Sequence, residues 1–270
     1  MPELPEVETT LRGIQPYVLN RCIDRVNVRE TRLRWPVDTR TQKAEGQTIT
    51  QLSRRGKYLL LHLHSGGLLI HLGMSGSLRV LTEPVNPQKH DHFDIEFEGG
   101  VCLRFNDPRR FGALLWTEDA VDQHPLLGKL GPEPLTPEFN AGYIYERSRG
   151  RRLAVKNFIM DGHVVVGVGN IYASEALFMS GIHPNRQAGR IAFHRYEGLV
   201  AAIKDVLESA IRRGGTTLRD FVGSDGAPGY FARELLVYDR AGKGCFQCDA
   251  PIRQKVIGQR SSYYCSVCQR

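Results

Sequence analysis

The chain has 270 residues, of which 41% are hydrophobic and 24% charged, a composition typical of a globular protein with room for about two domains. No apolar run approaches the ~18 residues of a membrane span, and the acidic start of the chain excludes an ordinary secretory signal, so we expect a cytoplasmic protein with no membrane partner. The net charge of +7 favours a polyanionic partner, of which nucleic acid is the commonest.

The chain begins with two prolines and two glutamates ahead of a helical pattern. Removal of the initiator methionine would expose the secondary amine of Pro2, which can attack a carbonyl-like carbon and become a permanently charged iminium. A helix beginning at Pro5 would place its positive end nearby and favour the unprotonated amine. Glu3 and Glu6 lie close enough in sequence to protonate a leaving oxygen or to hold a charged intermediate. The alternative is that this stretch only caps a helix.

Apolar residues at helical spacing predict an amphipathic helix from Val7 to about Val18. From about Cys22 to Trp116 the pattern changes to short strands separated by Gly and Pro clusters, which favours a β-sandwich or barrel. The clearest strands are Tyr58–Leu63, Gly67–Leu72, Phe93–Phe97 and Val101–Phe105.

Several polar or exposed side chains are predicted between these strands. Lys57 precedes a strand, Met74 lies in a loop flanked by glycines, and a turn after residue 105 carries Arg109 and Phe111. An exposed Met, Arg and Phe could wedge a base step open and fill the gap in a duplex. Taken singly, Met74 and Phe111 would be better explained by core packing.

The second half of the chain is mainly helical. A Pro- and Gly-rich stretch, residues 131–150, is predicted to be an interdomain linker, followed by a basic run that includes Arg151. Two glycines before Asn170 would expose backbone N–H groups at a helix start, where a phosphate can bind. Gly-rich residues 214–229 have the composition of a mobile lid. The predicted helices are Ala154–Met160, Ile171–Met179 and Phe193–Arg213.

Four cysteines near the end of the chain have the spacing of a structural zinc site, Cys-x2-Cys, sixteen residues, Cys-x2-Cys. The strand-like residues between the two pairs predict a β-hairpin with Arg260 near its tip. Four thiolates would close the metal site, so the zinc would be structural. A pair of disulfides is the alternative, disfavoured in the cytoplasm. His90 and His92 could also bind a metal, but no third ligand is obvious. The four cysteines are Cys245, Cys248, Cys265 and Cys268.

Six segments of the chain occur together, and in the same order, in one known family. They are Pro2–Thr9, Arg55–Tyr58, His71–Gly76, Asp107–Gly112, Val166–Ala173 and the four-cysteine hairpin. With these segments the chain resembles, over its whole length, the bacterial formamidopyrimidine-DNA glycosylases, base-excision enzymes for oxidised purines. One departure is Gly162, where the family usually has Asn.

The resemblance implies an α+β fold in four parts. These are an N-terminal catalytic domain of one helix and a β-sandwich (1–130), the linker (131–150), a helix-two-turn-helix DNA-binding domain with a lesion-capping loop (151–235) and a β-hairpin zinc finger (236–270). DNA would be held in the cleft between the halves.

By position, the resemblance assigns Pro2 as the Schiff-base nucleophile and Glu3 as the acid that opens the sugar ring, with Glu6 as a supporting carboxylate. Lys57 would act in β-elimination and Arg260 in δ-elimination. Void filling is assigned to Met74, Arg109 and Phe111. DNA contacts are assigned to His90, Arg109, Arg151, Lys156 and Asn170. The lesion-capping loop would include Thr216, Thr217, Arg219, Ser224 and Tyr230.

The implied protein is a monomeric bifunctional DNA glycosylase and AP lyase with one structural Zn²⁺. It would act, in the bacterial cytoplasm at the nucleoid, on double-stranded DNA with oxidised purines or abasic sites. One alternative is an endonuclease VIII-type enzyme for oxidised pyrimidines, which Leu4 disfavours because that type resembles Pro-Glu-Gly-Pro-Glu at its start. Another is a non-catalytic zinc-finger DNA-binding protein, against which Pro2, Glu3 and Lys57 argue.

Overall fold

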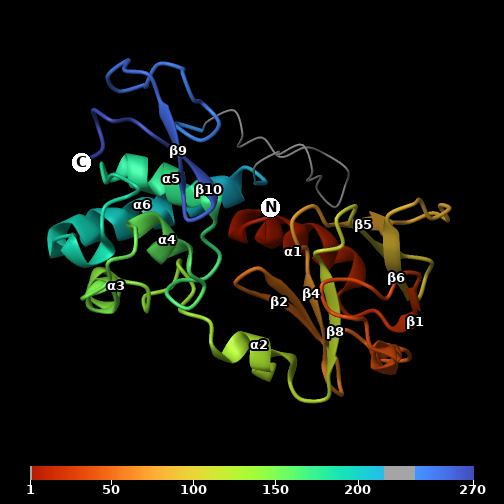
Figure 1. Ribbon diagram of the computed structural model, residues 1–270. Helices are drawn as coiled ribbons and strands as arrows, with labels where there is room; N and C mark the ends of the chain where they lie inside the picture. The colour runs from red at the N-terminus through yellow and green to blue at the C-terminus, as the bar shows by residue number, and fades with distance from the viewer. Residues whose placement is uncertain (1, 216–234) are drawn as a thin grey trace. The chain divides into compact units, whose positions relative to one another are not determined.

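The computed structural model describes residues 2–215 and 235–270 (Figure 1). The described residues form two compact units, which we call unit 1 (residues 2–129 and 213–215) and unit 2 (residues 130–212 and 235–270). Met1 and the five residues predicted for the lesion-capping loop, from Thr216 to Tyr230, lie outside the described residues.

Unit 1 contains two four-stranded antiparallel sheets, in the strand orders β1-β6-β7-β5 and β2-β3-β4-β8. Side chains from both sheets meet in one apolar core, which confirms the predicted β-sandwich. Alternation along each strand produces this core: in β6, for example, Phe93, Ile95 and Phe97 are all buried. The strands are β1 (Ile23–Val28), β2 (Gln51–Arg55), β3 (Tyr58–His62), β4 (Gly67–His71), β5 (Ser77–Leu81), β6 (Asp91–Phe97), β7 (Cys102–Asn106) and β8 (Ala113–Thr117). Short helical turns are η1 (Thr39–Ala44), η2 (Val121–Gln123) and α2 (Pro125–Gly128).

Helix α1 (Leu4–Val18) begins three residues earlier than the apolar pattern predicts. A capping box is the reason, because Glu3 and Glu6 each accept a backbone N–H from the other and so satisfy two donors of the first turn. Pro5 lies in that turn, where its missing N–H costs nothing. The helix packs against β2 and β3 of one sheet and β5 of the other (Figure 1).

Unit 2 is helical, with α3 (Ala141–Ser148), α4 (Val155–Met160), α5 (Asn170–Met179), the turn η3 (Ala188–Arg190) and α6 (Phe193–Arg212). The last three predicted helices are confirmed to within one residue or so at their ends. The predicted linker, however, is not all loop, because it contains α3. The side chain of Asn140 caps this helix by accepting the N–H of Tyr143, and α3 packs on α6. Within the described ranges no helix is long and apolar enough to cross a membrane.

The predicted hairpin near the end of unit 2 is formed by β9 (Arg253–Ile257) and β10 (Arg260–Tyr264). Gly258 and Gln259 both have positive φ, 54° and 63°, as the tight two-residue turn of a type I′ hairpin requires. Arg260 pairs with Ile257 directly after this turn, so its side chain is near the tip, as predicted.

Candidate functional site

The start of α1 brings the three predicted N-terminal site residues together. Pro2 is buried, and the carboxylates of Glu3 and Glu6 are only 1% and 3% exposed. The Glu3 N–H donates to Glu6 Oε2 at 2.8 Å. Gly215 lies over this corner, since a side chain there would come within 3.1 Å of Glu6 Oε1. The residue whose nitrogen becomes an amine once Met1 is removed is thus enclosed with two carboxylates at the positive end of a helix.

A salt bridge joins α1 to the turn that carries Lys57. Arg54 Nε donates to Glu8 Oε2 at 2.9 Å, and Arg12 Nε donates to Glu8 Oε1 at 2.8 Å. Burial opposes ionisation of Glu8, but the hydrogen bonds and charges of the two arginines outweigh it and lower its pKa. Arg54 also donates to the carbonyl of Gly56, in the two-residue turn between β2 and β3. Arg54 therefore links the turn that carries Lys57 to α1, the helix whose start carries Pro2.

Two neighbouring loops of unit 1 carry the predicted void-filling residues. Met74 is half-buried, whereas Arg109 is exposed and Phe111 is 44% exposed. The Arg109 guanidinium lies 5.3 Å from the centre of the Phe111 ring, a cation–π distance. An aromatic ring this exposed is not core packing, so the core alternative does not hold for Phe111.

The two histidines before β7 have different environments. His90 is half-buried, and its ring centre is 6.4 Å from that of His92. His92 is 5% exposed and donates from Nε2 to the carbonyl oxygen of Asp107 at 2.6 Å. His92 thus has a structural hydrogen bond, and the DNA contact assigned to His90 stays a prediction.

In unit 2, Lys156 connects α4, α5 and the hairpin. Its ammonium donates to Asn170 Oδ1 at 2.6 Å, to Ser262 Oγ at 2.7 Å and to the carbonyl of Ser261 at 3.1 Å. Asn170 Nδ2 also donates to the Ser261 carbonyl, at 3.0 Å. Lys156 is fully buried, which sequence reasoning did not anticipate for a predicted DNA contact, whereas Arg260 on the same hairpin is exposed. Burying an ammonium this deeply requires such partners.

The four cysteines of unit 2 converge as their spacing predicts. Their sulfurs all lie within 4.8 Å of one another, and two pairs are 3.5 and 4.0 Å apart. Tetrahedral zinc with Zn–S bonds of about 2.3 Å places its sulfurs about 3.8 Å apart. The cluster can therefore hold a metal ion, and in the described part of the chain it is the one group of acidic, His or Cys side chains suited to do so.

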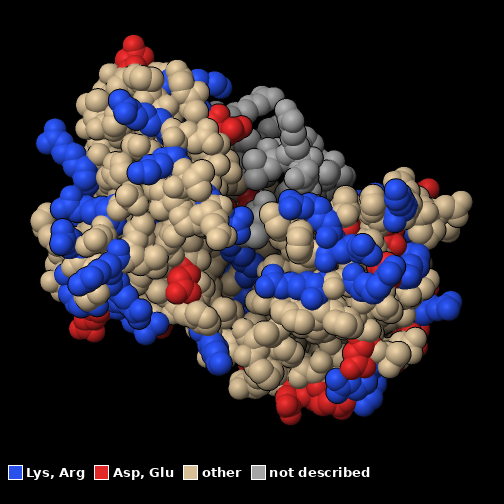
Figure 2. Space-filling model, in the orientation of Figure 1, with Lys and Arg blue, Asp and Glu red and all other residues tan. Residues whose placement is uncertain are grey.

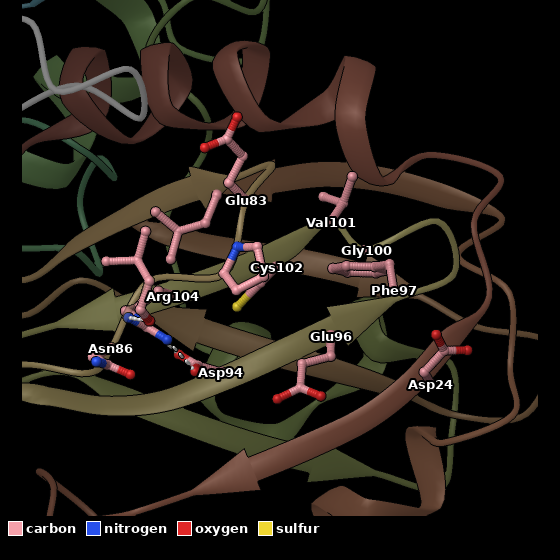
Figure 3. Close-up of a pocket in the computed structure, with 13 residues that line it drawn as sticks. Asp24, Glu83, Asn86, Asp94, Glu96, Phe97, Gly100, Val101, Cys102 and Arg104 are labelled. Carbon is pink, nitrogen blue, oxygen red and sulfur yellow. Dashed lines mark hydrogen bonds and ion pairs between the residues drawn. The ribbon is translucent and has the colours of Figure 1, made fainter.

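A cavity of about 440 Å³ in unit 1 has none of the predicted site residues in its lining (Figure 3). Its acidic lining residues are Asp24, Glu83, Asp94 and Glu96. Burial raises the pKa of Cys102, also in the lining, to about 12, so this thiol stays protonated. A negatively charged cavity repels a phosphate backbone, which excludes it as the nucleic-acid site.

Basic side chains are spread over the visible face of each unit (Figure 2). The exposed basic residues of unit 2 include Arg151 and Arg152, and those of unit 1 include Arg109 and Arg110. The acidic groups in this view are fewer. Each unit thus presents positive charge suited to a polyanion.

Sequence reasoning missed two buried carboxylates. Asp107 is fully buried beside the void-filling loops, and an Asp before Pro108 is a turn signal that could have indicated it. Glu175 on α5 is 1% exposed and accepts the N–H groups of Leu236, Val237 and Tyr238 at 2.7–3.0 Å. No local pattern around Glu175 indicates this distant segment.

Comparison with known proteins identifies the family. Residues 1–114 match the model of the formamidopyrimidine-DNA glycosylase N-terminal domain, and residues 130–222 match that of the formamidopyrimidine-DNA glycosylase H2TH domain. A formamidopyrimidine-DNA glycosylase of Magnetococcus marinus is 57% identical, with all of both chains covered.

Solved structures agree with this assignment. The MutM (Fpg) protein of Thermus thermophilus superposes with a TM-score of 0.90 at 36% identity, covering 99% of this chain and 98% of that one. The Lactococcus lactis Fpg mutant G226P in complex with Fapy-dG-containing DNA gives 0.91 at 31% identity, with both chains fully covered. The chain belongs to the formamidopyrimidine-DNA glycosylase family.

Proposed function

We propose that this protein is a base-excision repair enzyme that removes oxidised purines, such as 8-oxoguanine and formamidopyrimidines, from duplex DNA and then cleaves the strand. The observation that carries the proposal is the enclosed corner at the start of α1, where Pro2 lies with Glu3 and Glu6. Family membership supports the same activity. The damaged nucleotide must leave the stack first, because its anomeric carbon is inaccessible inside a duplex.

Once Met1 is removed, the Pro2 nitrogen bonds to C1′ of the extruded nucleotide while the bond from C1′ to the base breaks. The base leaves with the electron pair and takes up a proton. Glu3 then protonates the ring oxygen as the sugar opens, which leaves an iminium between Pro2 and C1′. Glu6, bonded to the Glu3 N–H, fixes the position of this acid.

The iminium acidifies C2′, and loss of that proton expels the 3′ phosphate. Loss of the C4′ proton then expels the 5′ phosphate. Lys57, on the turn held by the Glu8–Arg54 salt bridge, is proposed to bind the phosphate and to act in the first elimination. Arg260, exposed at the hairpin tip, is proposed to act in the second.

Both units are proposed to bind the DNA backbone. His90 and Arg109 would do so from unit 1, and Arg151 and Asn170 from unit 2. Lys156, assigned to phosphate binding by the resemblance, is buried, and we propose that it holds Asn170 and the hairpin in the binding arrangement. The endonuclease VIII-type alternative keeps the same chemistry and differs in its substrate.

We propose zinc as the metal of the four-cysteine cluster, because four convergent sulfurs are its preferred structural ligands. Cys245, Cys248, Cys265 and Cys268 would hold it. The cluster packs in a small core with Phe178 of α5 and Ile252, so a bound metal would fix the hairpin on the helices. With its four positions filled by sulfur, the metal would play a structural role.

Borohydride trapping tests the proposal. Wild-type protein incubated with an 8-oxoguanine duplex and borohydride should give a covalent adduct, and mass spectrometry should locate the sugar remnant on Pro2. Pro2→Gly offers a weaker, primary amine, and its adduct should form more slowly. An adduct located on a lysine would refute the mechanism, and the absence of any adduct would favour the pure DNA-binding alternative. Faster excision from an oxidised-thymine duplex would favour the pyrimidine enzyme.

A further inference from the structure

The carboxylate of Asp107 is fully buried and yet accepts three hydrogen bonds from two separate loops. Its Oδ1 accepts the hydroxyl of Ser75 at 2.7 Å and the N–H of Arg109 at 3.1 Å. Its Oδ2 accepts the N–H of Gly112 at 2.8 Å. A buried carboxylate whose two oxygens both accept hydrogen bonds from N–H or O–H groups holds those groups in place.

These donors bracket the void-filling side chains. Ser75 directly follows Met74, while Arg109 and Gly112 stand on either side of Phe111. Met74, Arg109 and Phe111 are partly or largely exposed. Ser75 and Asp107, which hold the backbones of their loops, are buried. One carboxylate therefore fixes the bases of both loops.

The two loops also contact each other directly. Gly73 has a φ of +71°, and any side chain at this position would overlap the backbone of Phe111 and Gly112. Gly73 donates its N–H to Nδ1 of His71 at 2.9 Å, which fixes the loop at its other end. The backbone beside Met74 therefore cannot shift without displacing the Phe111 loop.

Asp107 is itself fixed by the sheet from which it emerges. Its N–H donates to the carbonyl of His90 at 3.0 Å, and its carbonyl accepts Nε2–H of His92 at 2.6 Å. Its carbonyl also accepts the N–H of Arg110 at 3.3 Å, which closes the turn. The loops are thereby tied to β6 and β7, the rigid part of unit 1.

We propose that Asp107 is a positioning residue that makes Met74, Arg109 and Phe111 enter the duplex as one preassembled wedge. This inference rests on the proposed function, since it concerns the extrusion step of that reaction. Side chains on independent loops would each lose conformational entropy when they enter the duplex. In a preassembled wedge this entropy has already been lost on folding, so insertion costs less free energy. The carboxylate acts through the loops and need not touch DNA.

The test is Asp107→Asn, which keeps the size of the side chain but replaces one acceptor oxygen by an NH₂ group that faces a donor. Leaving a buried donor unsatisfied costs enough to slow extrusion by roughly tenfold. Ser75→Ala, which removes one bond of the three, should slow it by about threefold. The matched control is Asp94→Asn, a buried aspartate of the same sheet that is bonded to Arg29 and Arg104 and to neither loop.

Two readouts separate positioning from general destabilisation. The first is the fluorescence rise of 2-aminopurine opposite the lesion, which reports unstacking and should slow in Asp107→Asn and Ser75→Ala but not in Asp94→Asn. The second is the ratio of 8-oxoguanine excision to cleavage of a preformed abasic site. This ratio should fall in the two loop variants, because an abasic site has already lost its base pair.

Equal slowing on both substrates, or a wild-type fluorescence rise in Asp107→Asn, would overturn the positioning role. Should Asp107→Asn fail to fold, Ser75→Ala decides by the same two readouts. Failure of the proposed function looks different, because the wild-type protein itself would then neither excise nor form a trapped adduct.

Discussion

His71, at the end of β4, shows how a single titratable residue is kept in one protonation state. Its Nδ1 accepts the N–H of Gly73, which requires the neutral ring. Burial is the main cause that lowers its pKa to about 3, and the charges of Arg34 and Lys57 add to the effect. The ring therefore stays neutral at every pH at which a repair enzyme works, and the Met74 loop keeps its anchor.

This residue makes stability depend on pH. Between the unfolded-state pKa of about 6.5 and the lowered folded value, the unfolded chain binds a proton that the folded chain does not. The free energy of unfolding should therefore fall as pH drops from about 6.5 towards about 4.5, above the range in which the paired carboxylates titrate. His71→Gln, which cannot be protonated, should flatten this slope when Tm is measured across the interval. An unchanged slope would contradict the assignment.

Phe111 yields a second prediction at this scale. Phe111→Ala should lower the single-turnover rate of 8-oxoguanine excision by about tenfold, because base flipping exposes a gap that costs a few kcal/mol if left unfilled. Affinity for undamaged duplex should change little, since nonspecific binding depends on phosphate contacts. Phe193→Ala is the control: this ring is equally exposed, 45% against 44%, but lies on α6. Equal excision by both variants would argue against void filling.

Sequence spacing was enough to predict which side chains lie together where they belong to one local segment. Pro2, Glu3 and Glu6 are neighbours along the chain, so a helix start is enough to bring them together. Asp107 and Lys156 could not be understood in this way, because their partners come from segments between roughly thirty and a hundred residues away. Their burial follows from the tertiary fold, on which local spacing carries no information.

Among the elements, three strands of one sheet are joined by an ion-pair cluster. Asp94 on β6 accepts paired hydrogen bonds from Arg29, which directly follows β1, and from Arg104 on β7, at 2.7–2.9 Å. Burial opposes ionisation of Asp94, but both guanidinium groups outweigh it and lower its pKa. His92 lies on β6 and Asp107 directly follows β7, so the residues that fix the void-filling loops belong to the same sheet.

Asp94→Asn should reduce the free energy of unfolding by about 3 kcal/mol, because the buried Arg104 loses its nearest charge partner and keeps only the carboxylate of Asp91, 3.8 Å away. Arg29→Met should reduce the free energy of unfolding by less, because the Arg29 side chain is 25% exposed and the substitution removes the arginine charge itself. Urea unfolding at neutral pH measures both. A smaller loss in Asp94→Asn than in Arg29→Met would show that the cluster is not a buried network.

Elements with a strong local pattern were predictable and those defined by context were not. The hairpin was predicted because Gly258 and Gln259 specify a tight turn between two strand-like runs. Helix α3 was missed because the prolines before it suggested a linker, whereas Asn140 supplies a cap and α6 supplies a packing surface. The apolar repeat alone placed the start of α1 at Val7, whereas Pro5 indicated the earlier start, which the capping box stabilises.

At the scale of the whole molecule, base removal and the first elimination are proposed for unit 1, and the second elimination by Arg260 and part of the phosphate binding for unit 2. The sequence predicted the fold class and the metal cluster because several motifs agree. The separate zinc-finger domain and its boundaries remain a prediction. In the structure, α4, α5 and the hairpin belong to one compact unit, tied by Lys156.

The metal cluster gives the prediction at this scale. Cys248→Ser should lose the metal, release the hairpin and weaken DNA binding by at least about tenfold, because zinc-binding energy is folding energy in such sites. Metal content by emission spectroscopy and affinity by fluorescence anisotropy measure this. Cys102→Ser, a thiol outside the cluster, should retain both. Full metal content with normal affinity in Cys248→Ser would refute the structural role.

The two ends of the segment 216–234 are each secured by a buried glutamate. Gly215 rests against Glu6, and residues 236–238 are held by Glu175. Both attachments are made by residues outside this segment, so insertions or deletions confined to it leave the attachments intact. Residues 216–234 can therefore be exchanged as a cassette without changing the groups that hold the chain on either side.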